Sequence, residues 1–391
     1  MDDFGNYLID KIEKKNFKAY FVGGTVRDNI LKRKTTDIDI TSSANINQLI
    51  DIFENEKYYF IGKRKITLTF FKKNKKYEIT PFRKDTETLK DDLLDRDLTI
   101  NSIAYRKSVY YDYSNGIKDL NERTVKYNTN SKKIILEDPL RLLRAIRIAL
   151  QLDFFIDDRT YWNIKKFASH IVEVAKERIQ NEFTKIIVYG NDGINMLFRT
   201  NLLGNISPIF DEFHDEEYIL KYEKCSLISG LFLIYKVFGI NLYDYLDFLN
   251  SLSFPKKTIF KIKEIILLSN SFIDADKRTL KKLLNKFGKE TVFEYINILK
   301  SLGGTVIDRC ELDQIEKLLF EIISNDECYS LSDLKIDGRD IKNLGFSEGE
   351  TIGYILKEIL KIIIDNPDLN DKNTLLSIVE HYRTKSDDWG S

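Results

Sequence analysis

Two acidic residues separated by one position, Asp37 and Asp39, lie in the N-terminal part of this 391-residue chain. In an extended strand the side chains of residues i and i+2 point the same way, so both carboxylates project from one face. A divalent cation relieves their repulsion, and Mg²⁺ commonly takes one or two carboxylates together with substrate phosphates. We therefore predict that Asp37 and Asp39 are catalytic residues that bind Mg²⁺.

The glycine pair Gly23-Gly24 precedes these aspartates. An apolar strand from Tyr20 to Val22 leads into the pair, and a helix from Thr25 to about Lys32 is predicted to follow it. Glycine tolerates backbone angles that other residues avoid, and the N–H groups at a helix start can hold phosphate oxygens. The pattern predicts a tight turn that binds nucleotide phosphates, and hence nucleotidyl transfer. A loop without function and an exposed acidic strand are the alternative interpretations.

A third acid is available in a predicted hairpin from Lys65 to Phe82, whose turn is expected at Lys73–Lys75. In its second arm Glu78 and Thr80 share one face. Glu78 is therefore a candidate catalytic residue beside the aspartate strand. A solvated glutamate at the sheet edge is an equally good interpretation of the pattern.

A row of charged residues with a spacing of three follows further along the chain: Asp138, Arg141, Arg144 and Arg147. Residues three apart are neighbours on one face of a helix. Pro139 is favoured in a first helical turn, which predicts that Glu137 and Asp138 lie at the N-terminal end of this helix. Taken alone, the residues favour a helix cap followed by a salt-bridged surface.

The elements that must position these residues change type along the chain. Strand signals lie before about residue 125, whereas from about Glu137 onward apolar residues recur at i, i+3, i+4 and i+7. This change predicts an α+β protein with a mixed head and an all-α extension. Helices are predicted at Leu140–Leu150, Ile164–Val174, Ile179–Val188, Leu227–Val237, Phe260–Leu268, Val292–Leu299 and Ile315–Ile323.

The composition limits the possible functions. The 61 basic and 61 acidic residues cancel, so a nucleic-acid surface would have to be local. The three cysteines have neither pairing nor metal-ligand spacing, and the three histidines are isolated, so we expect no zinc site and no catalytic histidine. No apolar run approaches ~18 residues and no signal-like segment begins the chain. We expect a soluble cytoplasmic protein without a membrane partner.

Several segments resemble the class II tRNA nucleotidyltransferase and bacterial poly(A) polymerase family, whose head is similar to polymerase β. The segments that carry the resemblance are Phe21–Asp28 with its GGTVRD wording, Asp37–Asp39, Asp92–Ala104, Glu137–Arg147 and Glu177–Phe183. In the family's RRDFTxNAxA motif an arginine contacts the triphosphate or sugar, and the asparagine orients the nucleotide. Arg96 and Asn101 match these positions, whereas Asp95 and Leu98 depart from the pattern. The resemblance also implies nucleotide contacts by Gly23, Gly24 and Arg27.

The segment Glu137–Arg141 resembles EDxxR, the amino-acid template with which the family chooses the incoming base. The resemblance implies that Asp138 and Arg141 read the base edge, while Arg144 and Arg147 continue the nucleotide-binding row. A carboxylate accepts from the amine of cytosine or adenine, and an arginine donates to the ring nitrogen. Uracil and guanine reverse these roles and would leave buried groups unpaired.

The resemblance implies four domains: residues 1–121 as the nucleotidyltransferase head, 122–200 as a helical neck with the nucleotide-selecting helix, 201–302 as a helical body and 303–391 as a tRNA-binding tail. Asp112–Leu120 resembles a hinge segment of the family, and Ile336–Gly353 resembles part of its tail. Basic clusters at residues 32–34, 63–65 and 72–76 are candidate RNA contacts.

One segment bears on the choice of member. Lys84–Asp91 is short where members that incorporate the final A usually carry a longer flexible loop, and CC-adding members characteristically lack that loop. The resemblance therefore implies an enzyme that adds the two cytidines of the terminal CCA to tRNA from CTP, releases pyrophosphate, and binds the acceptor stem and elbow. A separate A-adding enzyme would then act after it. Complete CCA addition from CTP and ATP is the alternative; an A-adding enzyme, a poly(A) polymerase and a non-catalytic RNA-binding module are further alternatives.

Overall fold

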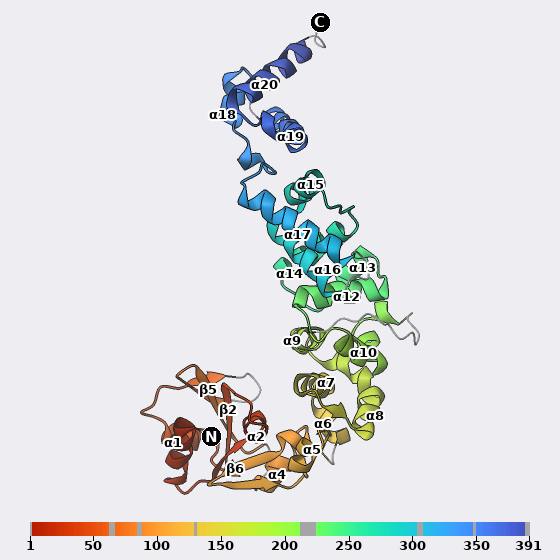
Figure 1. The fold of residues 1–391 in the computed structure, drawn as a ribbon. Coiled ribbons are helices and arrows are strands. Elements are labelled where there is room, and N and C mark those ends of the chain that lie inside the picture. The colour runs from red at the N-terminus through yellow and green to blue at the C-terminus, as the bar shows by residue number, and fades with distance from the viewer. Residues whose placement is uncertain are drawn as a thin grey trace. The chain divides into compact units, whose positions relative to one another are not determined.

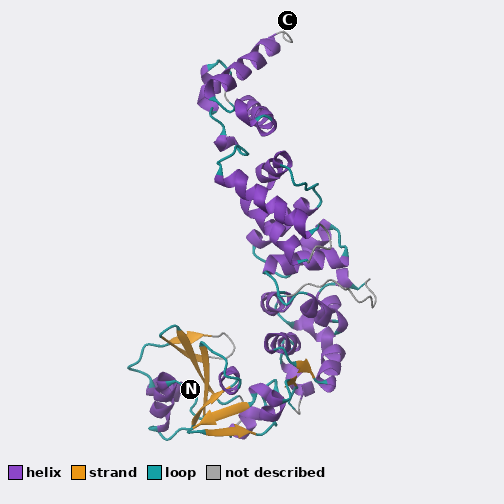
Figure 2. Ribbon diagram, viewed as in Figure 1, coloured by secondary structure: helices purple, strands orange, loops and turns teal. Residues whose placement is uncertain are grey.

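The computed structural model describes residues 2–61, 67–83, 88–128, 131–211, 224–302, 308–346 and 349–387. The chain forms two compact units, Met1–Glu217 with Ser251–Ser253, and Tyr218–Asn250 with Phe254–Ser391. The strands belong to the first unit, and the second is helical (Figures 1 and 2). The predicted α+β head followed by helical regions is confirmed, whereas the four domain borders stay a prediction.

A seven-stranded sheet in the order β3-β4-β5-β2-β1-β6-β7 forms the centre of the head. Only β2 and β5 pair in parallel among these strands; every other neighbouring pair is antiparallel. The strands are β1 (Ala19–Val22), β2 (Asp37–Ser42), β3 (Tyr59–Ile61), β4 (Thr67–Lys72), β5 (Lys75–Pro81), β6 (Ile103–Arg106) and β7 (Val109–Asp112).

The predicted hairpin is confirmed in its described part as β4 and β5. Lys73 and Asn74 connect the strands with φ angles of 48° and 60°, the left-handed conformation that two-residue hairpin turns use. Lys75 already belongs to β5, so the turn is one residue shorter than predicted. Lys65 and its basic neighbours, 63–64, lie outside the described residues.

The two faces of the sheet differ. Helix α1 (Asp3–Glu13) packs on one face, where the Tyr77 hydroxyl donates to Asp2 at 2.7 Å and the Phe4 ring meets the Tyr77 ring edge-on. Because side chains alternate along β5, Glu78 points to the opposite face. That face carries the candidate site.

The helices that complete the first unit are α2 (Gly24–Ile30), α3 (Ile46–Ile52), α4 (Leu89–Leu94), α5 (Gly116–Asn121), α6 (Ser131–Glu137), α7 (Arg141–Leu152), α8 (Asp158–Phe167), α9 (Lys176–Ile187), α10 (Asn191–Arg199) and α11 (Leu202–Ile206). A short parallel pair of strands, β8 (Thr124–Val125) and β9 (Phe155–Ile156), contacts α7. Helix α7 packs against α9 and α10 through buried residues such as Leu143 and Ile146. The segment predicted as one helix over Ile164–Val174 instead divides into the end of α8 and a 3₁₀ stretch, Ala168–Glu173.

The second unit consists of helices in its described part: α12 (Leu227–Phe238), α13 (Leu242–Ser251), α14 (Lys256–Ser269), α15 (Lys277–Phe287), α16 (Lys289–Ser301), α17 (Arg309–Ser324), α18 (Gly338–Asn343), α19 (Glu350–Asp365) and α20 (Lys372–Asp387), with two short 3₁₀ turns. Each of the four helices predicted here from apolar spacing is present. In the described ranges, no helix combines the length and apolar character needed to cross a membrane.

Candidate active site

Strand β2 carries the two aspartates as predicted. Ile38 and Ile40 are buried in the core, whereas Asp37 is exposed and Asp39 partly buried on the other face. The alternation along the strand therefore places both carboxylates on one side of the sheet.

Thr25 fastens the glycine-turn helix to this strand. Its Oγ1 donates to the backbone oxygen of Asp37 at 3.2 Å and accepts from the backbone N–H of Asp39 at 2.7 Å. The side chain is 1% exposed, so these bonds lie away from water. Sequence reasoning missed this residue, although a hydroxyl directly after the glycine pair was a usable signal.

Glu78 lies directly beside Asp39. The parallel register of β2 and β5 pairs Asp39 with Glu78 and Asp37 with Lys76. Lys76 also forms an ion pair with Glu78 at 2.6 Å. The structure thus brings the three predicted acids together, and it adds a cation that partly balances them.

The charges around Asp39 indicate that this site suits a cation. Burial, which has the largest effect, raises the pKa of Asp39 from 3.8 to about 6; Arg96 lowers it, and the nearby Glu78 and Asp37 raise it further. A carboxylate whose charged form is disfavoured in this way is stabilised by a bound divalent ion. No group of three His, Cys, Asp or Glu in the described part of the chain could hold a metal alone. The donor set therefore fits Mg²⁺ held by two aspartates, with the remaining ligands coming from substrate and water.

Gly23 is the glycine that this site requires. Its φ is 68°, and a Cβ atom there would lie 3.2 Å from Asp39 Oδ2 and 3.4 Å from Arg96 Nη1. Gly24 instead begins α2, and a Cβ there would make only ordinary contact with Arg27 at 3.5 Å. The prediction that both glycines need special backbone freedom is therefore wrong for Gly24. The helix also begins one residue earlier than predicted and ends at Ile30 rather than near Lys32.

Arg96 is held at the glycine turn by a buried carboxylate. Its Nη2 donates to Asp92 Oδ2 at 3.0 Å, and the Asp92 side chain is fully buried. Asp92 also accepts from the backbone N–H of Arg83 at 2.9 Å. These bonds fix the guanidinium beside the turn, where the phosphates of a nucleotide were predicted to bind.

Arg27 and Asn101, both predicted to contact the nucleotide, contact each other. Arg27 Nη1 donates to Asn101 Oδ1 at 2.9 Å, and both side chains are buried. Arg27 also forms an ion pair with Asp28 at 2.8 Å. Arg27 therefore orients the Asn101 amide, and the nucleotide contacts of both residues stay predictions.

The start of the charged-row helix differs from the prediction. Glu137 is the last residue of α6, so it does not lie in the first turn of the next helix. Residues 138–140 form a turn, in which the N–H of Arg141 donates to the Asp138 oxygen at 3.0 Å, and α7 begins at Arg141. Proline at 139 thus separates two helices rather than opening one.

Each side chain of the predicted nucleotide-binding row has a protein partner. Asp138 accepts from Arg178 at 2.8 Å, and Arg141 Nη1 donates to the Ile134 backbone oxygen at 2.8 Å. Further ion pairs join Arg144 to Asp97 at 3.0 Å and Arg147 to Glu182 at 2.5 Å. The Asp138 and Arg141 side chains thus bond to different partners, and their role in base choice stays a prediction.

Asp97, which lies between Arg96 and Asn101 in the segment Asp92–Ala104, links that segment to α7. Burial alone would raise the pKa of its carboxyl, but Arg144, Arg83 and Arg141 together hold it at about 2. Asp97 is therefore ionised and fixes the segment that carries Arg96 and Asn101 against the charged row.

Comparisons with known proteins cover almost the whole chain. Residues 19–126 match a poly A polymerase head domain, residues 153–213 a probable RNA and SrmB-binding site of polymerase A, and residues 230–379 a putative tRNA nucleotidyltransferase domain 2. A CCA-adding enzyme of Staphylococcus epidermidis is 29% identical over 96% of both chains. A CCA-adding enzyme of Staphylococcus haemolyticus is 37% identical over 46% of this chain and 48% of that one. The chain belongs to the tRNA nucleotidyltransferase and poly(A) polymerase family.

Two solved structures have the same fold as this chain. The crystal structure of the Bacillus stearothermophilus CCA-adding enzyme in complex with CTP matches 98% of both chains with a TM-score of 0.82 and 22% identity. The Thermotoga maritima CCA-adding enzyme complexed with tRNA matches 97% of this chain and 94% of that one, with a TM-score of 0.68 and 21% identity. Both likenesses confirm the predicted nucleotidyltransferase fold.

The short segment on which the CC-adding interpretation depends is described only in part. Residues 84–87 lie outside the described residues. Thr88 already caps α4 by accepting from the N–H of Asp91, and α4 contains Leu89 to Leu94. The connection between β5 and α4 is therefore even shorter along the chain than the sequence predicted.

Proposed function

We propose that this protein is a tRNA nucleotidyltransferase that builds the 3′-terminal CCA end from nucleoside triphosphates and releases pyrophosphate. One observation carries the proposal: the Gly23 turn brings the Arg96 guanidinium next to the Asp37–Asp39 face of β2. A turn that can bind phosphate, a positively charged guanidinium and two carboxylates that can bind a metal ion thus lie close together. The relatives named as CCA-adding enzymes, one of which was solved in complex with tRNA, support tRNA as the acceptor.

The residues have distinct parts in the reaction. Asp37 and Asp39 would hold Mg²⁺, which when bound neutralises charge on the triphosphate. The Gly23 turn and Arg96 position the phosphates, since a guanidinium forms strong paired hydrogen bonds with phosphate. The RNA 3′-oxygen forms a bond to the α-phosphorus while the bond to the pyrophosphate oxygen breaks. Glu78, beside Asp39, accepts the proton of the 3′-hydroxyl.

Base choice belongs to Asp138 and Arg141 in this proposal. Asp138 lies in the turn before α7 and Arg141 is the first residue of α7, which the Asp97–Arg144 pair joins to the segment of Arg96. To read a base edge, Asp138 must exchange its bond to Arg178, and Arg141 its bond to the Ile134 oxygen. Base choice therefore requires these two side chains to move.

We further propose that the enzyme stops after two cytidines. The support is the short connection along the chain between Arg83 and Thr88, where family members that incorporate A usually carry a longer loop. Complete CCA addition from CTP and ATP is the second candidate, favoured by the names of relatives that match 96% of this chain. In the CC-only case a separate A-adding enzyme completes the tRNA.

The deciding experiment uses tRNA that lacks its CCA end, with CTP and ATP together and Mg²⁺ present. Sequenced products that end in CC support the CC-only proposal, whereas products that end in CCA support the second candidate. Asp39→Ala should abolish addition, while Asp51→Ala, an exposed aspartate on α3 of the same head, should not. Near-normal addition by Asp39→Ala would refute the assigned site.

A further inference from the structure

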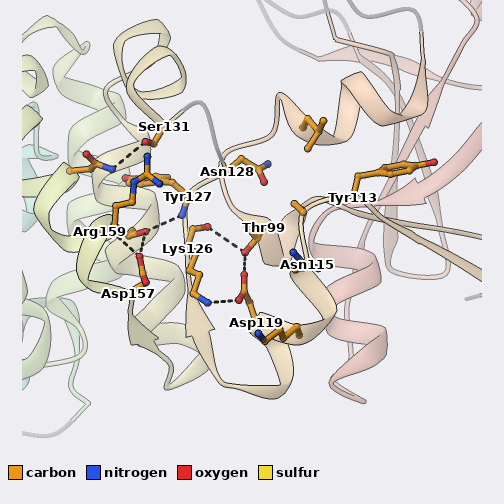
Figure 3. A pocket seen from close by; sticks show the side chains of 15 residues that line it. Thr99, Tyr113, Asn115, Asp119, Lys126, Tyr127, Asn128, Ser131, Asp157 and Arg159 are labelled. Atoms are coloured by element: carbon orange, nitrogen blue, oxygen red, sulfur yellow. Dashed lines mark hydrogen bonds and ion pairs between the residues drawn. The ribbon is translucent and has the colours of Figure 1, made fainter.

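A second cavity lies within the first unit, away from the aspartate face. It has a volume of about 410 Å³ and is lined by the segment around α5, by residues 126–128 after β8, and by residues of α6 and α8 (Figure 3). None of Asp37, Asp39, Asp138 and Arg141 lines it. Its volume falls within the roughly 300–1,000 Å³ typical of small-molecule sites.

A buried amide in the wall of this cavity lacks a hydrogen-bond partner. Asn128 is 2% exposed, and its Nδ2 donates to the Ser102 hydroxyl at 2.7 Å and to the backbone oxygens of Arg96 and Leu93 at 2.8 and 3.2 Å. These three acceptors fix the orientation of the amide. Its Oδ1 is buried and has no partner within the described residues. A buried acceptor without a partner is costly, so this atom calls for a donor from outside the protein.

A hydroxyl on the other side of the same cavity is in the same state. Ser114 Oγ is buried and makes no hydrogen bond within the described ranges of the chain. Its backbone N–H donates to Asp112, which fixes the loop that carries it. The cavity therefore offers an unused acceptor and an unused hydroxyl, from two separate elements.

The charges of the wall favour an anion. The charge of Asp119 is balanced by Lys126, whose Nζ lies 2.6 Å from one carboxylate oxygen (Figure 3). The other oxygen of Asp119 accepts a hydrogen bond from the Thr99 hydroxyl at 2.7 Å. Asp157 is occupied in capping α8, where it accepts from the N–H of Thr160 at 3.2 Å.

Two cations of the wall remain available. Lys118 has only a loose contact with Glu122 at 3.8 Å and a side chain that is 70% exposed. Arg159 is exposed and has no ion pair in the part of the chain that the structure describes. A guanidinium and an ammonium at one cavity are the usual partners of a phosphate group.

We propose that this cavity is a second ligand site, which binds a small phosphate ester with free hydroxyl groups, of the ribose phosphate class. The phosphate would be held by Lys118 and Arg159, and a ribose hydroxyl would donate to Asn128 Oδ1. Ser114 would complete the hydrogen bonds of the sugar. The same chemistry is present in a free mononucleotide and in the backbone of RNA.

The occupied site would act on the segment that carries Arg96 and Asn101. The Asn128 amide that meets the ligand also donates to the Arg96 backbone oxygen and to Ser102. Thr99 of the same segment lines the cavity and donates to Asp119. A ligand here therefore braces the loop that positions Arg96 at the glycine turn.

The test measures binding of ribose 5-phosphate to the full-length protein by calorimetry, in the absence of CTP. Arg159→Glu and Lys118→Glu should each weaken this binding about tenfold, since each removes a charged hydrogen bond. Lys165→Glu, the same charge change at an exposed position of α8 outside the cavity, should leave the affinity unchanged. Ser114→Ala should weaken binding without altering the melting temperature of the free protein.

A second arm replaces ribose 5-phosphate with a short single-stranded RNA. Binding of both ligands, or of the RNA alone, that falls in Arg159→Glu but not in Lys165→Glu supports the site and identifies its source. If neither ligand responds to Arg159→Glu and Lys118→Glu, the proposal is overturned. Inorganic phosphate serves as a probe for the anion contact alone.

Discussion

The Asp39 carboxyl is under opposing electrostatic influences. Burial and the neighbouring Glu78 and Asp37 raise its pKa, and Arg96 only partly offsets them, so that the pKa reaches about 6. At neutral pH the ionised form therefore dominates at a cost in stability. Such a strained carboxylate is typical of functional sites, where a ligand rather than the fold supplies the compensating charge.

The first prediction follows from the sign of this shift. The pKa of Asp39 is about 6 in the folded protein and 3.8 in the unfolded chain. The stability that this difference contributes is fully present below pH 3.8 and is lost as the pH rises through about 6. Asp39→Asn should therefore increase the free energy of unfolding at pH 8 by about 1–3 kcal/mol in chelator, with no gain near pH 4. Denaturant unfolding at both pH values measures it, with Asp51→Asn as the control. Mg²⁺ should raise the melting temperature of the parent protein more than that of Asp39→Asn, and equal increases would contradict the metal assignment.

The second prediction concerns Thr25. Thr25→Val keeps the shape of the side chain but leaves the Asp39 N–H and the Asp37 oxygen without their partner. This loss should cost about 1–3 kcal/mol of stability and lower kcat. Thr25→Ser keeps the hydroxyl and should retain most of the activity. If valine and serine variants have the same kcat, Thr25 does not position the aspartates.

At the scale of elements, α7 joins the two halves of the site. Its buried face, with Leu143 and Ile146, packs against α9 and α10, while Arg144 reaches Asp97 in the head motif. Arg147 meets Glu182 of α9, so the last residue of the predicted nucleotide row also braces two helices. At the start of α7, the bond of Asp138 to Arg178 and the bond of Arg141 to the Ile134 oxygen are the contacts that base reading would have to exchange.

The third prediction tests that helix start. If Asp138 reads the base edge, Asp138→Ala should lose discrimination between CTP and UTP by about 1–3 kcal/mol, roughly ten- to a hundredfold in relative kcat/KM. Arg178→Ala removes the present partner of Asp138 but keeps the carboxylate, so it should preserve the discrimination. Unchanged preference for CTP in Asp138→Ala would show that this end of α7 is only a salt-bridged surface.

Sequence reasoning succeeded where one local rule decided the structure. The alternation around Asp37 and Asp39, the hairpin arms and most helices predicted from apolar spacing are set by neighbouring residues, and the structure confirms them. The helix predicted over Ile164–Val174 is the exception, because it divides into α8 and a 3₁₀ stretch. Sequence reasoning failed for Glu137, because the turn at Pro139 depends on α6 packing beside α7. The Thr25 bonds and the Asp97–Arg144 pair also escaped, since their partners lie 12 to 47 positions away and become neighbours only through the tertiary fold.

At the scale of the whole chain, the family models extend from residue 19 to 379, and the site residues all lie before Arg178. The helical second unit therefore contributes none of the residues proposed for chemistry. That residues 303–391 form a tRNA-binding tail, as the resemblance of residues 336–353 to the family's tail implies, stays a prediction. In the CC-only proposal, the point at which addition stops depends on the segment between β5 and α4.

The fourth prediction is that this segment limits the enzyme to two cytidines. Its ends are anchored, because the Arg83 N–H donates to Asp92 and Thr88 caps α4. At ~3.3–3.6 Å per residue, the residues between them cannot reach across the site as a longer loop could, so nothing re-angles Asp138 and Arg141 for a purine. Replacing residues 84–87 with the longer loop of an A-incorporating family member should allow A to be added to tRNA that ends in CC. Insertion of a glycine-serine segment of equal length is the control and should not. If the unmodified chain adds the final A efficiently, the CC-only proposal fails, while the roles of Asp37 and Asp39 are unaffected.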